Sequence, residues 1–307
     1  TSNAQYNFKN YYEFNSGLPY SYVLDIVFNE DTAWFATYGK GIANFNGNTW
    51  KTYNSSNSGI GDTIIDIEVD KSGNLWFASY YRGVSKYKDR KFFHYPSFNG
   101  IKNFETTQIT EDSKGNIWIA TYGYGIFKYN NDSFIQHDTN NGLISNFIYS
   151  IRGDSKGGLW IGTDVGVNYL NDNTLTTLTE NDGLIFNNIN RINIDRSGNI
   201  WFSTRKGVSK FNGSSWTNFS EMNGLSDETV WSVAEDHEGN IWFATNSEGV
   251  NIYDGNSFTV INKVVGITDN QVINLSVDDT GSVWVQTTFG VSKVTKKPIS
   301  ISKKPLD

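Results

Sequence analysis

Seven tryptophans divide the chain into units of nearly equal length. Successive members are separated by 42, 42, 42, 41, 41 and 42 residues, and each lies in a phrase of similar form, such as "GNIWIATYGYGIFKY" at 115–129 and "GNIWFSTRKGVSKF" at 198–211. Self-similarity at a fixed period of this length indicates a repeat architecture, in which each unit packs against its neighbours. The seven residues are Trp34, Trp76, Trp118, Trp160, Trp201, Trp242 and Trp284.

One unit, residues 223–262, shows what is repeated. Short runs rich in Val, Ile, Trp, Phe and Tyr alternate with turn signals that contain Gly, Asn and Asp, and this pattern predicts strands joined by hairpins. We expect strands at 229–235, 240–245, 249–253 and 257–262. Four strands in about 42 residues match a propeller blade in both size and strand content. The chain is therefore predicted to be all-β.

The two ends of the chain complete each other. The start, "YNFKNYYEFNSGL", resembles the fourth strand and the following Gly-Leu of other units, whereas the seventh unit loses its repeat character after its third strand. We expect residues 6–14 to pair with residues 290–295, which closes the ring and leaves no blade incomplete. The prediction is a seven-bladed β-propeller with four antiparallel strands per blade, the last blade being closed by the N-terminal strand.

This propeller is expected to span residues 5–295. Residues 1–4 have the composition of an expression-tag remnant and are excluded from the fold. Residues 296–307 are expected to form a C-terminal tail or linker.

Six of the units carry an Asp-x-x-Gly sequence shortly before the tryptophan. This spacing predicts a tight turn in which the carboxylate accepts backbone N–H groups and the glycine adopts a left-handed conformation. A calcium loop is the alternative, but the turns lack the alternating oxygen ligands that such a loop needs. The aspartates are Asp70, Asp112, Asp154, Asp195, Asp236 and Asp278.

The repeated phrase, Gly-Leu followed by "VxxIxxDxxGNIWFATxxGVSKY", resembles the two-component regulator propeller repeat. The resemblance implies the periplasmic sensor region of a bacterial hybrid two-component system, many of which respond to glycan breakdown products. Full sensors of this family commonly contain two rings and further modules. The resemblance therefore implies either a piece of such a sensor or a free-standing propeller, in both cases extracytoplasmic.

Function is expected where the copies differ, which is at the loops between the second and third strands of each blade. These read "TYGKG", "SYYRG", "TYGYG", "TDVG", "TRKG", "TNSEG" and "TTFG", and they share one face with the connections between blades. We call this the loop face, and the opposite side the turn face. Aromatic rings beside cations suit stacking on sugar rings and pairing with acidic substituents. The candidate ligand-binding residues are Tyr38, Lys40, Tyr80, Tyr81, Arg82, Tyr122, Tyr124, Arg205 and Lys206.

Two interpretations of these tyrosines stay open at this point. Either they contact a ligand, or they only pack over the strand ends. The predicted ligand is an oligosaccharide or another small molecule, recognised for signal transduction. A second hypothesis is a protein-interaction platform that docks another propeller or a different protein, and a third is a propeller lyase or hydrolase.

The first strand of each unit is expected to line the central channel. Counting back from the tryptophans gives two rings of positions. The first ring is Asp25, Asp66, Gln108, Ser150, Arg191, Ser232 and Asn274; the second ring is Val27, Glu68, Thr110, Arg152, Asn193, Ala234 and Ser276. The residues between the rings are apolar and should pack between blades.

The channel predictions assume that the first strands contain no bulge. On that assumption the polar positions face water, with Asp25, Asp66 and Glu68 across the channel from Arg152 and Arg191. A hydrated channel is favoured over a bound cation.

Composition excludes several function classes. The net charge of −7, from 25 basic and 32 acidic residues, disfavours nucleic acid. No apolar run is long enough for a membrane segment, and the absence of cysteine removes disulfides and thiolate metal sites. No metal or cofactor is predicted. The three histidines, His94, His137 and His237, fall on outer strands or in a turn, so no catalytic constellation is found and the chain is not predicted to be an enzyme.

Overall fold

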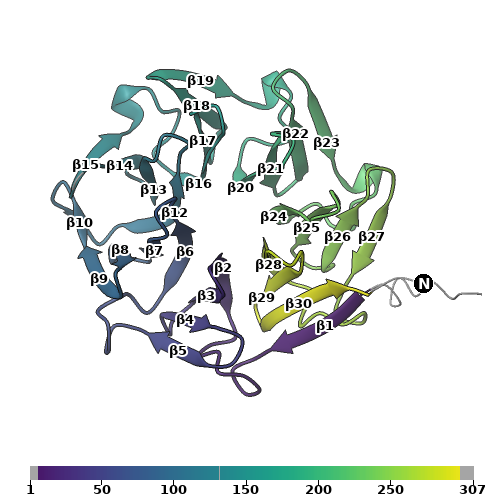
Figure 1. Cartoon of the computed structure of the whole chain (residues 1–307). Helices are drawn as coiled ribbons and strands as arrows, with labels where there is room; N and C mark the ends of the chain where they lie inside the picture. The colour runs from purple at the N-terminus through teal and green to yellow at the C-terminus, as the bar shows by residue number, and fades with distance from the viewer. Residues whose placement is uncertain (1–5, 131, 298–307) are drawn as a thin grey trace, which may run out of the picture.

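The computed structural model of the chain describes residues 6–130 and 132–297. In this part of the chain, seven four-stranded antiparallel sheets surround a central axis like the blades of a propeller (Figure 1), and one two-stranded hairpin lies outside them. The predicted fold class is confirmed. The proposed tag remnant, 1–4, and most of the predicted tail, 296–307, lie outside the described residues.

Six blades are antiparallel meanders that start at the axis and end at the rim, and the seventh takes its outermost strand from the N-terminal part of the chain. The first two blades consist of β2 (Val23–Asn29), β3 (Thr32–Thr37), β4 (Ile42–Phe45) and β5 (Trp50–Tyr53), then β6 (Ile64–Val69), β7 (Leu75–Ser79), β8 (Gly83–Lys88) and β9 (Lys91–Tyr95). The extra hairpin, β10 (Ser97–Phe98) and β11 (Ile101–Lys102), follows the second blade.

The third and fourth blades consist of β12 (Glu105–Glu111), β13 (Ile117–Tyr122), β14 (Ile126–Asn130) and β15 (Ser133–His137), then β16 (Ile148–Gly153), β17 (Leu159–Thr163), β18 (Val167–Asn171) and β19 (Thr174–Leu178). Short 3-10 turns follow the fourth strands of the third, fourth and fifth blades, at η2 (Thr139–Asn141), η3 (Glu180–Asp182) and η4 (Glu221–Asn223).

The last three blades consist of β20 (Ile189–Ile194), β21 (Ile200–Thr204), β22 (Gly207–Phe211) and β23 (Trp216–Phe219), then β24 (Val230–Glu235), β25 (Ile241–Thr245), β26 (Val250–Tyr253) and β27 (Phe258–Ile261), and finally β28 (Val272–Val277), β29 (Val283–Thr287), β30 (Gly290–Lys296) and β1 (Tyr6–Tyr11). The four strands predicted within 223–262 are confirmed to within one residue at each end.

The ring is closed by the two ends of the propeller. β1 pairs with β30 in an antiparallel register that runs from Tyr6 opposite Lys296 to Tyr11 opposite Val291, and Figure 1 shows the purple and yellow strands side by side. The predicted closure is confirmed, although the strand ends at Tyr11 and not at residue 14. It ends there because the chain turns: the backbone N–H of Tyr12 donates to Asn15 Oδ1, and the backbone N–H of Asn15 donates to the carbonyl oxygen of Tyr12.

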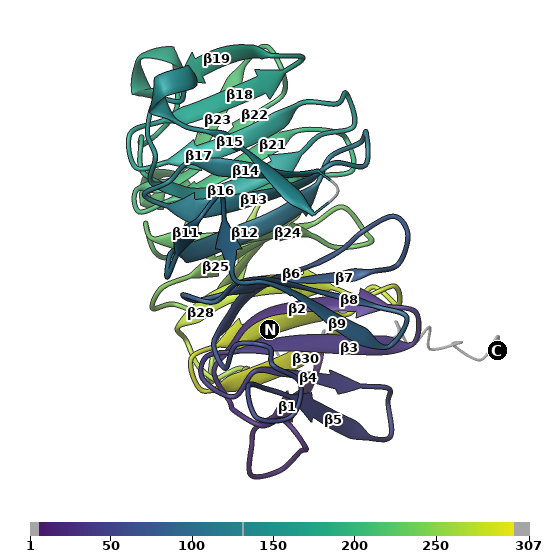
Figure 2. The same ribbon diagram turned by 90° about the vertical axis from the view of Figure 1, so that its left-hand side faces the viewer.

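The hydrophobic core is divided into seven clusters, one at each junction between blades. A repeat tryptophan from one blade packs into each of them; Trp76, for example, packs with Ile109 and Phe127 of the next blade. All seven tryptophans are buried. Figure 2 shows the molecule from the side, with the blades stacked against one another around the ring.

The aspartates of the Asp-x-x-Gly turns anchor these tryptophans. Oδ1 of Asp112 accepts the backbone N–H groups of Lys114 and Asn116, and Gly115 is left-handed with φ of 83°. The predicted turn is confirmed. In addition, Oδ2 accepts the indole N–H of Trp118 at 2.9 Å, a bond that the sequence analysis did not predict. The same indole-to-aspartate bond occurs in the other five turns of this type.

Every innermost strand contains a bulge, so the assumption of bulge-free strands was wrong. The pairing of β2 with β3, for instance, shifts between Val23 and Asp25, and the other six innermost strands shift at the equivalent place. In each innermost strand the bulge lies before the first-ring residue. The alternation of side chains between the two sides of the strand is therefore unaffected after it, and both rings keep their predicted positions. The extra residues are Leu24, Ile65, Thr107, Tyr149, Asn190, Trp231 and Ile273.

Candidate functional site

The loop face carries a cluster of exposed tyrosines on the first three blades. The exposed fraction is 48% for Tyr38, 49% for Tyr81 and 41% for both Tyr122 and Tyr124. Isolated bridges join Tyr38 to Thr63, Tyr80 to Glu105 and Tyr122 to Phe147, each linking one blade to the beginning of the next. We call Tyr38, Tyr80, Tyr81, Tyr122 and Tyr124 the tyrosine arc.

Tyr81 lies in an unusual backbone conformation at the tip of its loop. Its φ is 62°, in the left-handed region that bulky side chains avoid. Tyr81 follows its repeat tryptophan by five residues, and the residues at the same distance in the first and third blades are Gly39 and Gly123, with φ of 116° and 101°. The second blade thus places an exposed aromatic side chain where its neighbours have glycine. Such a conformation costs about 1–2 kcal/mol for a residue other than glycine.

Tyr80 and Tyr81 form a joined aromatic pair. Their ring centroids are 4.1 Å apart, and the Tyr81 hydroxyl donates to the Tyr80 hydroxyl at 3.2 Å. This hydrogen bond and the nearby Glu105 carboxylate raise the pKa of Tyr80 to about 12. In the first blade, Tyr38 packs against Tyr22 with a centroid distance of 5.3 Å.

The third blade extends the aromatic surface toward the channel. Tyr122 packs against Phe147, with centroids 4.9 Å apart, and against Tyr149 at 5.8 Å. Tyr124 meets Phe104 edge-on at 6.5 Å. These contacts hold one side of each tyrosine while about two fifths of its surface stays exposed. The same residues therefore pack over the strand ends and remain partly exposed to solvent.

The cations predicted beside the arc have acidic or aromatic neighbours. Hydrogen bonds from Ser55 lower the pKa of Asp62, and the nearby charges of Arg82 and Lys40 lower it further. Across the face, the Arg205 guanidinium lies 6.0 Å from the Trp231 ring centroid, and the Lys206 ammonium lies 4.6 Å from that of Phe186. The loop face therefore carries cations close to flat aromatic rings.

Sequence reasoning missed Tyr149 and Trp231 as residues of this face. Both occupy the bulge position of an innermost strand, which turns an extra side chain out of the normal alternation. Trp231 is held by a hydrogen bond from its indole N–H to Asn246 Oδ1 at 3.2 Å. The sequence did contain a signal for these two residues: the residue immediately before the first-ring position is aromatic in these two blades alone.

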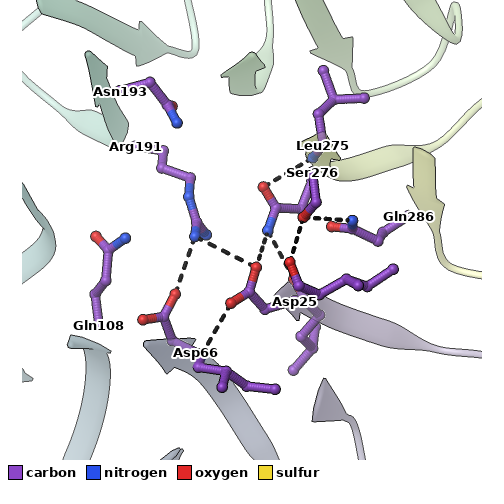
Figure 3. A network of polar contacts seen from close by, with 12 residues as sticks. Asp25, Asp66, Gln108, Arg191, Asn193, Leu275, Ser276 and Gln286 are labelled. Carbon is purple, nitrogen blue, oxygen red and sulfur yellow. Dashed lines mark hydrogen bonds and ion pairs between the residues drawn. The ribbon is translucent and has the colours of Figure 1, made fainter. Parts of the chain in front are cut away.

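In the channel, one arginine spans the opening between blades. Arg191 on β20 reaches Asp66 on β6 at 3.0 Å and Asp25 on β2 at 3.9 Å (Figure 3). The predicted acidic and basic blades thus lie opposite each other. Burial and the neighbouring Asp25 raise the pKa of Asp66 to about 8, and burial also raises the pKa of Asp25. The two carboxylates share one cation, so the pair holds a proton at neutral pH.

The first ring does not face water, contrary to the sequence prediction. Asp25, Asp66 and Gln108 are only 5%, 2% and 3% exposed. Their side-chain oxygens accept the backbone N–H groups of Ile67, Ile109 and Ile151, respectively, on the next blade, at 2.9–3.0 Å. The ring is polar because it joins the innermost strands to one another. Arg191 occupies the same ring position, but its guanidinium has no acceptor atom for a backbone N–H of the next blade. Its side chain extends across the channel to the two aspartates instead.

The second ring, with Glu68 and Arg152, borders a cavity that extends toward the turn face. Burial raises the pKa of Glu68, while the Arg152 charge opposes that rise. Among the described residues there is no group of three or more histidine, cysteine or acidic side chains placed to hold a metal ion.

The histidines lie away from the loop-face centre. His94 is on β9 and His137 on β15, both fourth strands, and His237 is in the turn between β24 and β25. Within residues 6–130 and 132–297, no helix has the length and apolar character to cross a membrane.

A seven-bladed propeller with a variable aromatic loop face is thus the class that the fold and the site define. Four segments match the family model described as two-component regulator propeller, at residues 102–123, 142–165, 183–206 and 224–247. These four repeats therefore match the two-component regulator propeller family, and the resemblance predicted from the sequence is confirmed. No curated protein matches the chain.

Solved structures of similar fold include both extracellular domains of two-component systems and lyases. The extracellular domain of a protein described as a hybrid two-component system from B. thetaiotaomicron is 27% identical, with a TM-score of 0.84 over 93% of this chain and 40% of that chain. A second such domain from the same organism is 19% identical, with a TM-score of 0.73 over 93% of this chain and 42% of that one. The chain spans less than half the length of either.

A virginiamycin B lyase from Staphylococcus aureus is 14% identical, with a TM-score of 0.77 over 94% of this chain and 99% of that chain. At this identity the likeness shows the fold alone. A propeller fold supports both binding and catalysis, so function has to be argued from the residues of the site.

Proposed function

We propose that the loop face binds an oligosaccharide or a glycan fragment, as the extracytoplasmic ligand-binding part of a bacterial signalling system. The observation that carries the proposal is Tyr81. Its side chain is exposed, and its backbone is left-handed at a position where the neighbouring blades have glycine. Backbone strain of this kind is retained mainly where function requires it.

The rest of the tyrosine arc supports the same function. Sugar rings present flat C–H faces that stack on aromatic rings, and Tyr38, Tyr81 and Tyr124 are each 41–49% exposed and accessible to such contacts. Lys40 and Arg82 supply cations beside the arc for acidic substituents. The similarity to an extracellular domain of a hybrid two-component system supports the signalling role and the extracytoplasmic location.

Calorimetric titration with neutral, uronate-containing and sulfated oligosaccharides tests the proposal. A binder should lose at least about tenfold in affinity when Tyr38, Tyr81 and Tyr124 are all replaced by alanine, since each stacked ring is worth about 1 kcal/mol. Phe93→Ala is the matched control, because Phe93 is 46% exposed but lies on the rim strand β9. Unchanged affinity in the triple variant would place the binding site elsewhere.

A further inference from the structure

The channel contains a cavity of about 390 Å³ between the first ring and the turn face. Its wall is formed by innermost strands from several blades, and it includes Asp25, Asp66, Glu68, Arg152 and Arg191. The volume is at the lower end of the range for small-molecule sites. Neither the family nor the tyrosine arc gives this cavity a role.

Three side chains in the wall present unused hydrogen-bond donors. Gln108 Oε1 accepts Ser150 Oγ at 2.7 Å and the Ile151 N–H at 2.9 Å, while Asn193 Oδ1 accepts the Val233 N–H at 3.4 Å. These bonds fix the amide oxygens, so both amide nitrogens point into the opening (Figure 3).

Within the described residues, those two nitrogens and the Arg152 guanidinium have no hydrogen-bond partner and no ion-pair partner within 4.0 Å. Arg152 is the charged member of the three and carries five N–H donors. Such a group, left without a partner in a confined space, favours an anionic ligand group.

The wall of the same cavity contains a negative group, Glu68. Glu68 Oε1 accepts the Glu111 N–H at 3.0 Å, and Glu68 Oε2 has no hydrogen bond among the described residues. Toward the turn face the wall also includes Asp195, Glu235 and Asp279. In contrast, Asp25 and Asp66 are already occupied by Arg191 and by backbone N–H groups. The cavity therefore offers a donor-rich site at Arg152 beside an acidic site at Glu68.

We propose that this cavity binds a small zwitterion with one carboxylate and one protonated amine, of the size of a free amino acid. The carboxylate pairs with Arg152 and the Asn193 and Gln108 amides, and the amine pairs with Glu68. A simple anion would be repelled by the surrounding carboxylates, and a simple amine would leave Arg152 unpaired. This inference does not rest on the function proposed for the loop face.

Thermal unfolding in the presence of each of the standard L-amino acids tests the proposal, with acetate and methylamine as probes that carry one group each. At least one amino acid should raise the unfolding temperature in a concentration-dependent manner, whereas neither single-group probe does so at the same concentration. Calorimetry then gives the affinity. Arg152→Gln should weaken binding by about 10- to 100-fold, because a charge-assisted hydrogen bond is lost.

Asn193→Asp provides a second variant in case Arg152→Gln does not fold. It keeps the acceptor for the Val233 N–H but replaces the donor with a negative charge, so it should weaken binding to a similar extent. Lys91→Gln, at an exposed position on the rim strand β9, should bind like the wild type. The proposal is overturned if no amino acid shifts the unfolding temperature, if acetate acts as strongly, or if Arg152→Gln and Asn193→Asp bind normally.

Discussion

Tyr81 combines backbone strain with an exposed aromatic surface. Substitution can therefore separate its effect on stability from its effect on ligand affinity. Tyr81→Gly should leave the free energy of unfolding unchanged or raise it by up to about 1 kcal/mol, because glycine adopts a left-handed φ without a steric cost. The same change should reduce oligosaccharide affinity. Urea denaturation and calorimetry measure the two effects.

Tyr124→Gly is the matched control, because Tyr124 lies in a similar loop but does not have a positive φ. There, glycine should destabilise the protein by roughly 0.5–1 kcal/mol. If Tyr81→Gly destabilises the protein as much as the control, the left-handed conformation of Tyr81 is not a source of strain.

Asp66 makes stability depend on pH. Its folded-state pKa is raised from 3.8 to about 8 by burial and by Asp25. Between these values the folded protein holds a proton that the unfolded chain has lost, so this group's contribution to stability falls as pH rises, by up to about 1.4 kcal/mol per pH unit. The contribution is fully present below pH 3.8 and is lost as pH rises through about 8.

Asp66→Asn removes this titration and leaves Asp25 as the only carboxylate partner of Arg191. Denaturation with urea at about pH 5 and pH 8 should show a smaller loss of stability in the variant than in the wild type. Equal losses would mean that Asp66 is ionised in the folded protein throughout this range.

At the scale of the strand and the turn, the bond from aspartate to indole couples each turn to the adjoining core. Asp112→Ala removes the acceptor of the Trp118 N–H and of two backbone N–H groups. We expect a loss of about 2–4 kcal/mol, because buried donors are left unsatisfied. Asp112→Asn keeps one acceptor oxygen and should lose less. Thermal and urea unfolding measure both, and a loss under 1 kcal/mol for Asp112→Ala would contradict the coupling.

Features that depend on the residues of a single strand or turn were predicted correctly from the sequence. The strand limits within 223–262, the turn role of Asp112 and the apolar position of Ile109 all follow from local pattern. The bulge before Asp25, the burial of the first ring and the Trp118 bond did not follow, because each depends on the register between strands or on contact between blades. The predicted roles of Tyr38 and the rest of the tyrosine arc stay predictions.

At the scale of the whole molecule, the closure between β1 and β30 determines whether seven blades form one cooperative unit. Asn7 lies opposite Thr295 in this pairing, and the chain contains no cysteine. A disulfide between Asn7→Cys and Thr295→Cys should raise the free energy of unfolding by about 2–4 kcal/mol, because it holds the ring closed. The reduced form is the control. No difference between the oxidised and reduced forms would indicate that opening of the seam does not precede unfolding.

The location of the ligand on the whole molecule is the central claim. A crystal structure of the protein with the tightest-binding oligosaccharide tests it most directly. The account predicts sugar rings stacked on Tyr38, Tyr81 and Tyr124, with any acidic substituent near Lys40 or Arg82. An oligosaccharide bound on the turn face, or along the rim strands and away from the tyrosine arc, would contradict it.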